Sequence, residues 1–343
     1  MRMRTAYLQR GLSLIELMIA MALSLLLMLG VLQIFLSSKQ TYAANSALSR
    51  VQESGRFAMD FITYDLRNAG YKGECFTDAV GSSTDDRLNI NNAIKGWEAQ
   101  TGLPTWPENI GTNKEVGTDS ILIKHAATSA GALGTTDIPV NASSITMAST
   151  NGEAKETNVL ISNALGCDMF LSGNVTATAI VKDSSGNLSR SYTPAITKVL
   201  VFQSNQYYVR KGENGKPPSL WRTSWRKGTS TPLTMELIEG VQDLQFEYGI
   251  STGIGENRAI ANTAFVKANA VTDWNNVAAV KVRLLALSNE ANISPDLQVY
   301  DREKGLICKK GDSTCTAANS IDIPDRRLGQ VFTAVVSLRN KLP

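Results

Sequence analysis

The strongest constraint on the fold is an apolar run near the N-terminus. Residues 12–36 read LSLIELMIAMALSLLLMLGVLQIFL, a stretch of 25 residues that would extend about 37 Å as an α-helix, enough to cross a bilayer. Arg2, Arg4 and Arg10 precede the run, so we expect a cytoplasmic N-terminus and an exported remainder. A secretory signal would have a shorter apolar core followed by a small-residue cleavage site and a turn. Here neither feature is present, so the run predicts a membrane anchor.

The net charge of +3 belongs to the same N-terminal segment. The first eleven residues hold three of the 34 basic residues and no acid, which leaves 31 basic residues against 31 acidic ones in the rest of the chain. The remainder therefore offers no global positive field for nucleic acid. Only 19% of residues are charged, and Gly, Ser, Thr and Asn are abundant, a composition that favours an extracellular β domain over a cytosolic helical enzyme.

Glu16 is an acid close to the start of the apolar run. A carboxylate in hydrocarbon costs roughly 3 kcal/mol and needs a positively charged partner. If the chain is cut after Gly11, Leu12 acquires a free α-amine about 6 Å along the helix from Glu16. A neighbouring subunit that is staggered along the helix axis can then place its own amine on this carboxylate.

Residues 10–17, RGLSLIEL, resemble the class III signal of type IV pilins and pseudopilins, usually G|FTLIEL. The resemblance implies cleavage between Gly11 and Leu12 by a prepilin peptidase, N-methylation of Leu12, and a role for Glu16 in assembly. Leu12 in place of Phe and Ser13 in place of Thr are mild departures. The alternative is an uncleaved single-span anchor in which the glutamate occurs by chance.

A helical period continues beyond the apolar run. Gly55 costs about 1 kcal/mol within a helix and indicates a bend, and Gly70 is the expected C-terminal stop. The helix should run from Leu12 to about Asn68, near 85 Å in length. Its second half has one apolar stripe to bury against a globular head. The stripe consists of Ala44, Leu48, Val51, Ala58, Phe61, Ile62, Leu66 and Ala69.

After residue 75 the pattern changes to short apolar runs bounded by turn residues. Residues 81–113 are rich in loop-forming residues, with Trp97 and Trp106 as expected anchors. Between 196 and 224 we expect a meander with turns at Ser204–Asn205 and at 212–218. The expected further strands are 120–124, 158–162, 175–181, 241–250, 277–287 and 330–338. The prediction is an α+β fold, in which the long N-terminal helix packs against a largely antiparallel β-sheet head, as in type IV pilins.

The four cysteines are Cys75, Cys167, Cys308 and Cys315. An even count favours disulfides in an oxidising compartment. A zinc site is disfavoured because no CxxC pair occurs and the chain has one histidine. Four cysteines allow three pairings, of which we favour Cys308–Cys315 as a short loop and Cys75–Cys167 as a link between distant segments.

The sequence offers little catalytic or cofactor chemistry, and we predict neither an enzyme nor a cofactor or metal site. His125 is the sole candidate base and follows the apolar run 121–123, which favours a strand end. Residues 212–216 (GENGK) lack Walker spacing and read as a turn. Residues 183–187 (DSSGN) lack the later glutamate of a calcium loop and also read as a turn.

Residues 207–227 mix aromatic and basic side chains, as many nucleic-acid-binding sites do. Such mixtures can stack bases and hold phosphates, but alternation across a hairpin gives the same pattern with aromatics inside and cations outside. We favour the hairpin. The set is Tyr207, Tyr208, Arg210, Lys211, Trp221, Arg222, Trp225, Arg226 and Lys227.

Several segments also resemble PilW-like minor pilins of the type IV pilus. They are YYVRKG, PSLWR, ELIEGVQDLQFEYGI, DWNNVAAVKVRLLALS and DRRLGQVFTAVVSLRN. The likeness covers the N-terminal helix and most of 196–343. J-type minor pseudopilins of type II secretion share the helix and part of this core but are generally shorter, so we favour the pilus.

The resemblance implies a minor pilin in pilus initiation, assembly or the tip complex, which would support twitching motility, adhesion or DNA uptake. Its partners would be other minor pilins and the major pilin through the helix, the prepilin peptidase, the inner membrane and a tip adhesin; nucleic acid is disfavoured. The expected divisions are a leader (1–11), a transmembrane half-helix (12–36), an amphipathic half (37–70) and a periplasmic head (71–343). A tethered periplasmic binding protein that enters no filament is the alternative of another class.

Overall fold

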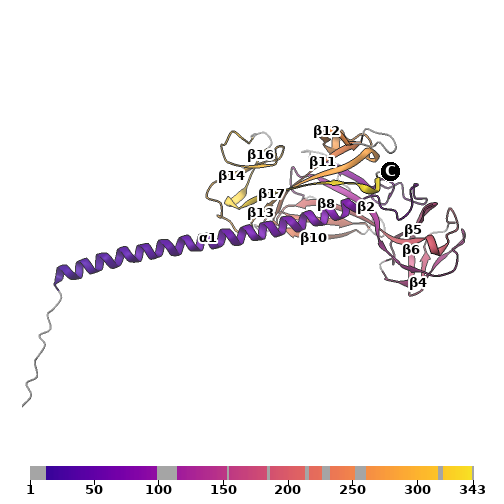
Figure 1. Cartoon of the computed structure of the whole chain (residues 1–343), viewed down its shortest axis with the longest axis horizontal. Coiled ribbons are helices and arrows are strands. Elements are labelled where there is room, and N and C mark those ends of the chain that lie inside the picture. Colours follow the sequence, from indigo (N-terminus) through magenta and orange to yellow (C-terminus); the bar gives the residue numbers. More distant parts are fainter. Residues whose placement is uncertain are drawn as a thin grey trace, which may run out of the picture.

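In the computed structural model, one long helix projects from a β-rich head (Figure 1). The structure describes residues 13–98, 114–152, 154–183, 186–212, 216–225, 232–251, 260–315 and 320–341. The helix, α1, spans Leu14–Asn68 and contains 55 residues. All pairs of named strands are antiparallel. The predicted α+β, pilin-like fold is therefore confirmed.

The described strands form three sheets. The ten-stranded sheet contains β1 (Ile94–Trp97), β2 (Ser120–Ser129), β3 (Gly131–Leu133), β4 (Ser144–Thr150), β5 (Asn158–Asn163), β6 (Gly166–Thr176), β7 (Ala179–Lys182), β8 (Lys198–Arg210), β9 (Ser219–Ser224) and β10 (Leu233–Glu239). The four-stranded sheet, in the order β12-β11-β13-β17, contains β11 (Val241–Ser251), β12 (Ile260–Val266), β13 (Val277–Leu287) and β17 (Gly329–Ser337). The small sheet contains β14 (Gln298–Asp301), β15 (Leu306–Lys309) and β16 (Ser320–Asp322). Short 3-10 turns span Pro194–Ile196, Ala268–Ala270, Trp274–Asn276, Pro324–Arg326 and Arg339–Lys341.

The main core lies where the second half of α1 meets the four-stranded sheet and strands β2 and β8. Ala58, Ile62 and Leu66 are fully buried on the helix and belong to one apolar cluster with Tyr207 of β8 and Val280 of β13. Gly70, at a φ of 77°, ends the helix in the left-handed conformation that glycine tolerates best. The helix end agrees with the expected stop.

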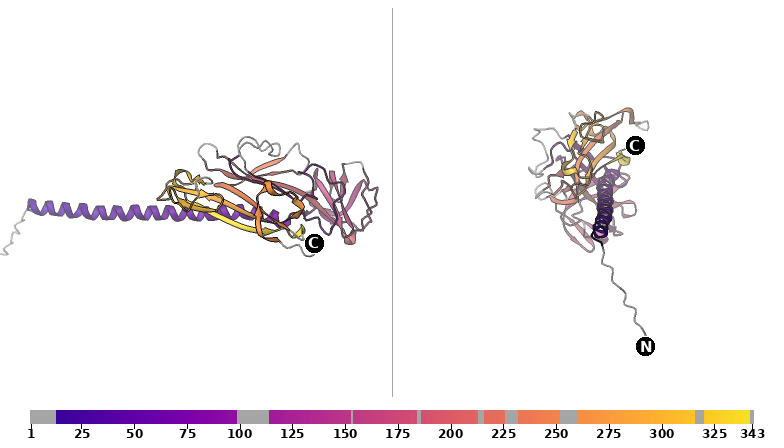
Figure 2. Two further views of the ribbon diagram at one scale, coloured as in Figure 1. Left: turned by 90° about the horizontal axis from the view of Figure 1, so that it is seen from above. Right: turned by 90° about the vertical axis from the view of Figure 1, so that its left-hand side faces the viewer.

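The head is elongated along the helix axis, and its two ends differ (Figures 1 and 2). The small sheet lies at the end from which α1 projects, and its loop is closed by Cys308–Cys315. The far end is a lobe of residues 130–192, which we call the distal lobe. Its apolar cluster also includes Val199 and Val201 of β8. Cys75–Cys167 connects the segment after α1 to β6 across 92 residues of sequence. These are the two pairings favoured above.

Most expected strands are present, and two local interpretations are wrong. Ser204 and Asn205 form no turn, because β8 continues through them and they are buried. Residues 175–181 are not one strand, since β6 ends at Thr176 and β7 begins at Ala179. Trp97 lies at the end of β1; Trp106 falls outside the described residues.

Candidate assembly interface

The first half of α1 is an apolar surface that the head leaves uncovered. Every residue from 13 to 42 is exposed, including Leu14 at 75% and Phe35 at 63%. Figure 1 shows this part of the helix extending well beyond the head. Continuous apolar surfaces of this extent mark contact with a membrane or with other proteins. The helix is long and apolar enough to cross a membrane.

Glu16 lies in the first turn of α1. Ser13 is the N-cap residue, and its backbone N–H donates to Glu16 Oε2 at 3.0 Å. An acid at this position also suits the positive end of the helix dipole. Gly11 and Leu12 fall outside the described residues. Cleavage between them, methylation of Leu12 and the assembly role of Glu16 therefore remain predictions.

The second half of α1 has an outward face as well as a buried one. Phe57, Phe61 and Tyr64 are 41%, 40% and 60% exposed. Their spacing of four and three residues places them on one side of the helix. We call these three side chains the outer aromatic stripe. Phe61 was expected in the buried stripe and is not there; Leu48, at 39% exposed, is a second exception.

A buried carboxylate fixes the second half of α1 to the head. Asp65 accepts hydrogen bonds from Tyr207 Oη at 2.7 Å, from Asn205 Nδ2 at 2.8 Å and from His125 Nε2 at 3.2 Å. Burial raises the pKa of Asp65, but the hydrogen bond and attraction from His125, with the hydrogen bonds from Tyr207 and Asn205, outweigh it and hold the pKa below its ordinary value. One helix side chain thus joins strands β2 and β8.

The contact with Asp65 gives His125, the single histidine of the sequence, a structural role. His125 Nε2 faces Asp65, and His125 Nδ1 accepts from the backbone N–H of Ala127 at 3.3 Å. Both ring nitrogens are therefore used within the fold, and the side chain is fully buried. The sequence analysis did not identify Asp65 as the partner of His125. An acid among the apolar residues of the helix stripe could have indicated it.

Gly55 allows close approach of the helix to β17. A Cβ at this position would lie 2.0 Å from Phe332 Cε2, far inside van der Waals contact. Gly30, in the exposed half, has no heavy atom within 4 Å of the corresponding point. The two glycines of α1 therefore have different surroundings.

Within the described part of 207–227, the aromatic and basic side chains do not form a joint platform. Tyr207, Tyr208 and Trp225 are at most 1% exposed. The Arg210 guanidinium lies over the Trp221 ring, 4.2 Å from its centroid. Arg226 and Lys227 are outside the described residues. Buried tyrosines offer no stacking surface, so the arrangement supports the hairpin interpretation.

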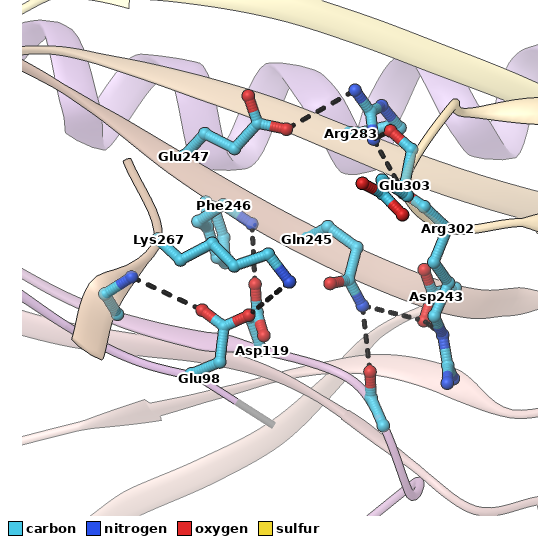
Figure 3. A network of polar contacts seen from close by, with 12 residues as sticks. Glu98, Asp119, Asp243, Gln245, Phe246, Glu247, Lys267, Arg283, Arg302 and Glu303 are labelled. Carbon is cyan, nitrogen blue, oxygen red and sulfur yellow. Dashed lines mark hydrogen bonds and ion pairs between the residues drawn. The ribbon is translucent and has the colours of Figure 1, made fainter. Parts of the chain in front are cut away.

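A polar cavity of about 470 Å³ lies beside β11 (Figure 3). Its charges pair with one another: Lys267 with Glu98 at 3.0 Å, and Arg283 with Glu247 at 3.5 Å. Next to it Arg302 pairs with buried Asp243 at 2.9 Å. Burial raises the pKa of Asp243 to about 6 despite Arg302. Asp243, Glu247 and Arg283 lie in the four-stranded sheet, whereas Glu98 directly follows β1 and Arg302 directly follows β14. The network therefore links the four-stranded sheet to segments next to the other two sheets, and we assign it a structural role.

Two family models match the chain. Residues 206–340 match the family described as Type IV Pilus-assembly protein W, and residues 7–32 match the Prokaryotic N-terminal methylation motif. The first match includes the whole four-stranded sheet that α1 packs against; the second spans the signal and much of the exposed half of α1. The distal lobe lies outside both. No match was found among curated proteins or among solved structures. The resemblance drawn from the residues is confirmed.

Proposed function

We propose that this PilW-like, membrane-anchored minor pilin of the type IV pilus system acts in the initiation of pilus assembly. Its N-terminus would lie in the cytoplasm and its head in the periplasm of the inner membrane. A prepilin peptidase would remove residues 1–11 and leave an N-methylated Leu12. The mature subunit would then join other minor pilins and the major pilin, and reach the cell surface with the filament.

The observation that carries this proposal is the division of α1. Only one face of its second half packs on the head, while the whole first half and the outer aromatic stripe are exposed. Lipid can cover the first half in the membrane. Once a subunit leaves the membrane, only the helices of neighbouring subunits can replace that lipid, and apolar surface of this kind strongly favours such burial.

Glu16 supplies the specificity of this packing. In a low-dielectric helical bundle a carboxylate requires a positive partner, and the terminal amine of a staggered neighbour is the nearest one available. A tethered binding protein that never leaves the membrane would gain nothing from an acid at this depth. The match to the pilus-assembly W family further supports the pilus proposal over the J-type pseudopilin of type II secretion.

The leader should be removed between Gly11 and Leu12. Glycine leaves the scissile bond unobstructed, and the bond precedes the helix, which begins at Leu14. Intact-mass measurement of the protein from membranes and from sheared pili should give a chain that starts at Leu12 and carries one methyl group. A mass that retains residues 1–11, or a start beyond residue 36, would contradict the assignment.

Glu16→Ala should remain anchored yet fail to support assembly. Removal of the acid makes the helix a better lipid solute, but it leaves a neighbour's amine unpaired in the bundle. Unpaired buried charges cost about 3–5 kcal/mol, so we expect at least about a tenfold loss of surface pili and of twitching. Sheared pili are quantified at equal membrane levels of each variant.

Ser24→Ala is the matched control, because the Ser24 hydroxyl donates only to Met21 O in its own helix, at 2.9 Å. This variant should assemble normally. Normal piliation by Glu16→Ala at wild-type abundance would reject the assembly mechanism and favour the tethered binding protein.

A further inference from the structure

Strand β17 forms a free edge of the four-stranded sheet. Its register with β13 pairs Ala279 with Ser337 and Leu287 with Gly329. Leu338 N donates to Ala278 O at 2.8 Å, which fixes the even-numbered residues of this strand as those bonded to β13. In antiparallel pairing the alternate residues direct their N–H and C=O groups the other way. The backbone groups of Thr333, Val335 and Ser337 therefore point out from the sheet.

These outward groups have no partner in the described part of the chain, and their residues are exposed, Val335 at 57%. Proteins usually protect such an edge with lysine, proline, a bulge or a covering segment. The sequence of β17, GQVFTAVVS, contains no charge and no proline, and its pairing with β13 shows no register shift. A long, regular and unprotected edge is suited to receive another strand.

A groove of about 670 Å³ lies beside this edge, between β17 and α1. Phe332, Ala334 and Met59 give it apolar walls, and Gln52 and Arg56 of α1 are among its polar ones. A strand added to β17 would direct alternate side chains into the groove, because side chains alternate between the faces of a sheet. The other side chains would lie beside Val335 on the opposite face.

We propose that the free edge of β17 accepts an extended strand from a different pilin-like subunit anchored in the same membrane. This inference rests on the proposed function. Thr333, Val335 and Ser337 present donors and acceptors repeated about every 6.8 Å along the strand, a pattern that only another extended backbone matches. The groove wall is the second half of α1, so the docked subunit lies directly above the region where the helices assemble.

A second copy of this chain does not fit the site in the usual symmetric way. Two identical edges related by a two-fold axis pair antiparallel, and the axis reverses every direction in the plane of the sheet. Because α1 packs on the face of this sheet, the two helices would point in opposite directions. Both could not then be anchored in one membrane with the same orientation.

Site-specific photo-crosslinking in cells tests the proposal on the full-length chain. A photoreactive phenylalanine analogue replaces Val335 in one strain and Tyr64, in the outer aromatic stripe, in another. We expect the Val335 probe to attach to a β-strand peptide of another chain that carries a prepilin signal, identified by mass spectrometry. Thr333→Pro removes one outward N–H and should reduce this adduct about five- to tenfold, the worth of roughly one hydrogen bond. Thr333→Ala keeps the N–H and should leave the yield unchanged.

The two probes separate the two proposals. Adducts to pilins from Tyr64 but not from Val335 would overturn the strand-docking inference and leave the assembly function intact. The absence of pilin adducts from both would reject the assembly function. A Val335 adduct to a second copy, to a non-pilin protein or to a helix of a pilin would also overturn strand docking. The probe at Val335 is exposed and needs no destabilising substitution, so a folding defect in Thr333→Pro does not affect this result.

Discussion

The two halves of α1 share one backbone conformation and differ in what surrounds them. From residue 13 to 42 every side chain is exposed, whereas Ala47, Ala58, Ile62 and Leu66 farther along are fully buried by the head. Residues 17–36 are apolar on nearly all sides, and the second half is apolar mainly on one face. A helix that is apolar all round needs an environment beyond its own chain. The head therefore buries part of the second half of the helix only, and the first half needs lipid or other subunits to cover it.

Asp65→Ala should produce the largest loss of stability on this helix. Its removal leaves Tyr207, Asn205 and His125 without their buried acceptor, and each buried donor left unsatisfied costs about 1–3 kcal/mol. Thermal unfolding of full-length protein in detergent, followed by tryptophan fluorescence, measures the loss. Asp60→Ala removes an exposed acid five residues away on the same helix and should change stability by less than about 0.5 kcal/mol. Equal effects of the two changes would refute the anchoring role of Asp65.

Alanine substitution of Gly55 and of Gly30 tests the difference in packing between the two halves of α1. Gly55→Ala should destabilise the head by about 1–3 kcal/mol, because the new methyl group meets the Phe332 ring. Gly30→Ala introduces the same methyl group where no atom lies nearby, and it should not lower the unfolding temperature. Phe332→Leu in the Gly55→Ala background should recover part of the loss. If both alanine variants unfold like the wild type, β17 does not pack on the helix as described.

Much of the helix and of the C-terminal sheet was predictable because their signals are local. The apolar run, Glu16 and Gly70 define the helix, and the runs 241–250 and 277–287 correspond to β11 and β13. The distal lobe was less accessible, since its short strands consist largely of small and polar residues. Its arrangement depends on pairing between distant segments, such as β5 with β8, which periodicity does not report.

The wrong turn at Ser204–Asn205 has a specific physical cause. Polar residues within a strand usually indicate a turn, yet Asn205 donates to Asp65 at 2.8 Å and accepts from Ser224 Oγ at 2.6 Å. Asn205 is polar because it bonds to the helix and to β9 inside the head, whereas the buried Ser204 hydroxyl has no hydrogen-bond partner among the described residues. Such long-range partners cannot be read from a single sequence. For the same reason the assembly signal was predictable from the sequence, whereas the free edge of β17 required the strand order.

Tyr64→Ala should have the smallest effect on stability, although Tyr64 lies in the second half of α1. Its ring is 60% exposed, so its loss should cost the isolated subunit no more than about 0.5 kcal/mol. Ile62→Ala, two residues away and fully buried, should instead cost about 2–5 kcal/mol. Thermal unfolding of both variants in detergent tests this difference. If the outer aromatic stripe faces neighbouring helices, Tyr64→Ala should also reduce incorporation into sheared pili while Ser24→Ala does not. A Tyr64→Ala variant that unfolds early would place the ring against the head, whereas one that is stable and assembles fully would remove the stripe from the interface. A stable variant with reduced incorporation would show that the outward face of the second half, like the whole first half, is completed by other subunits.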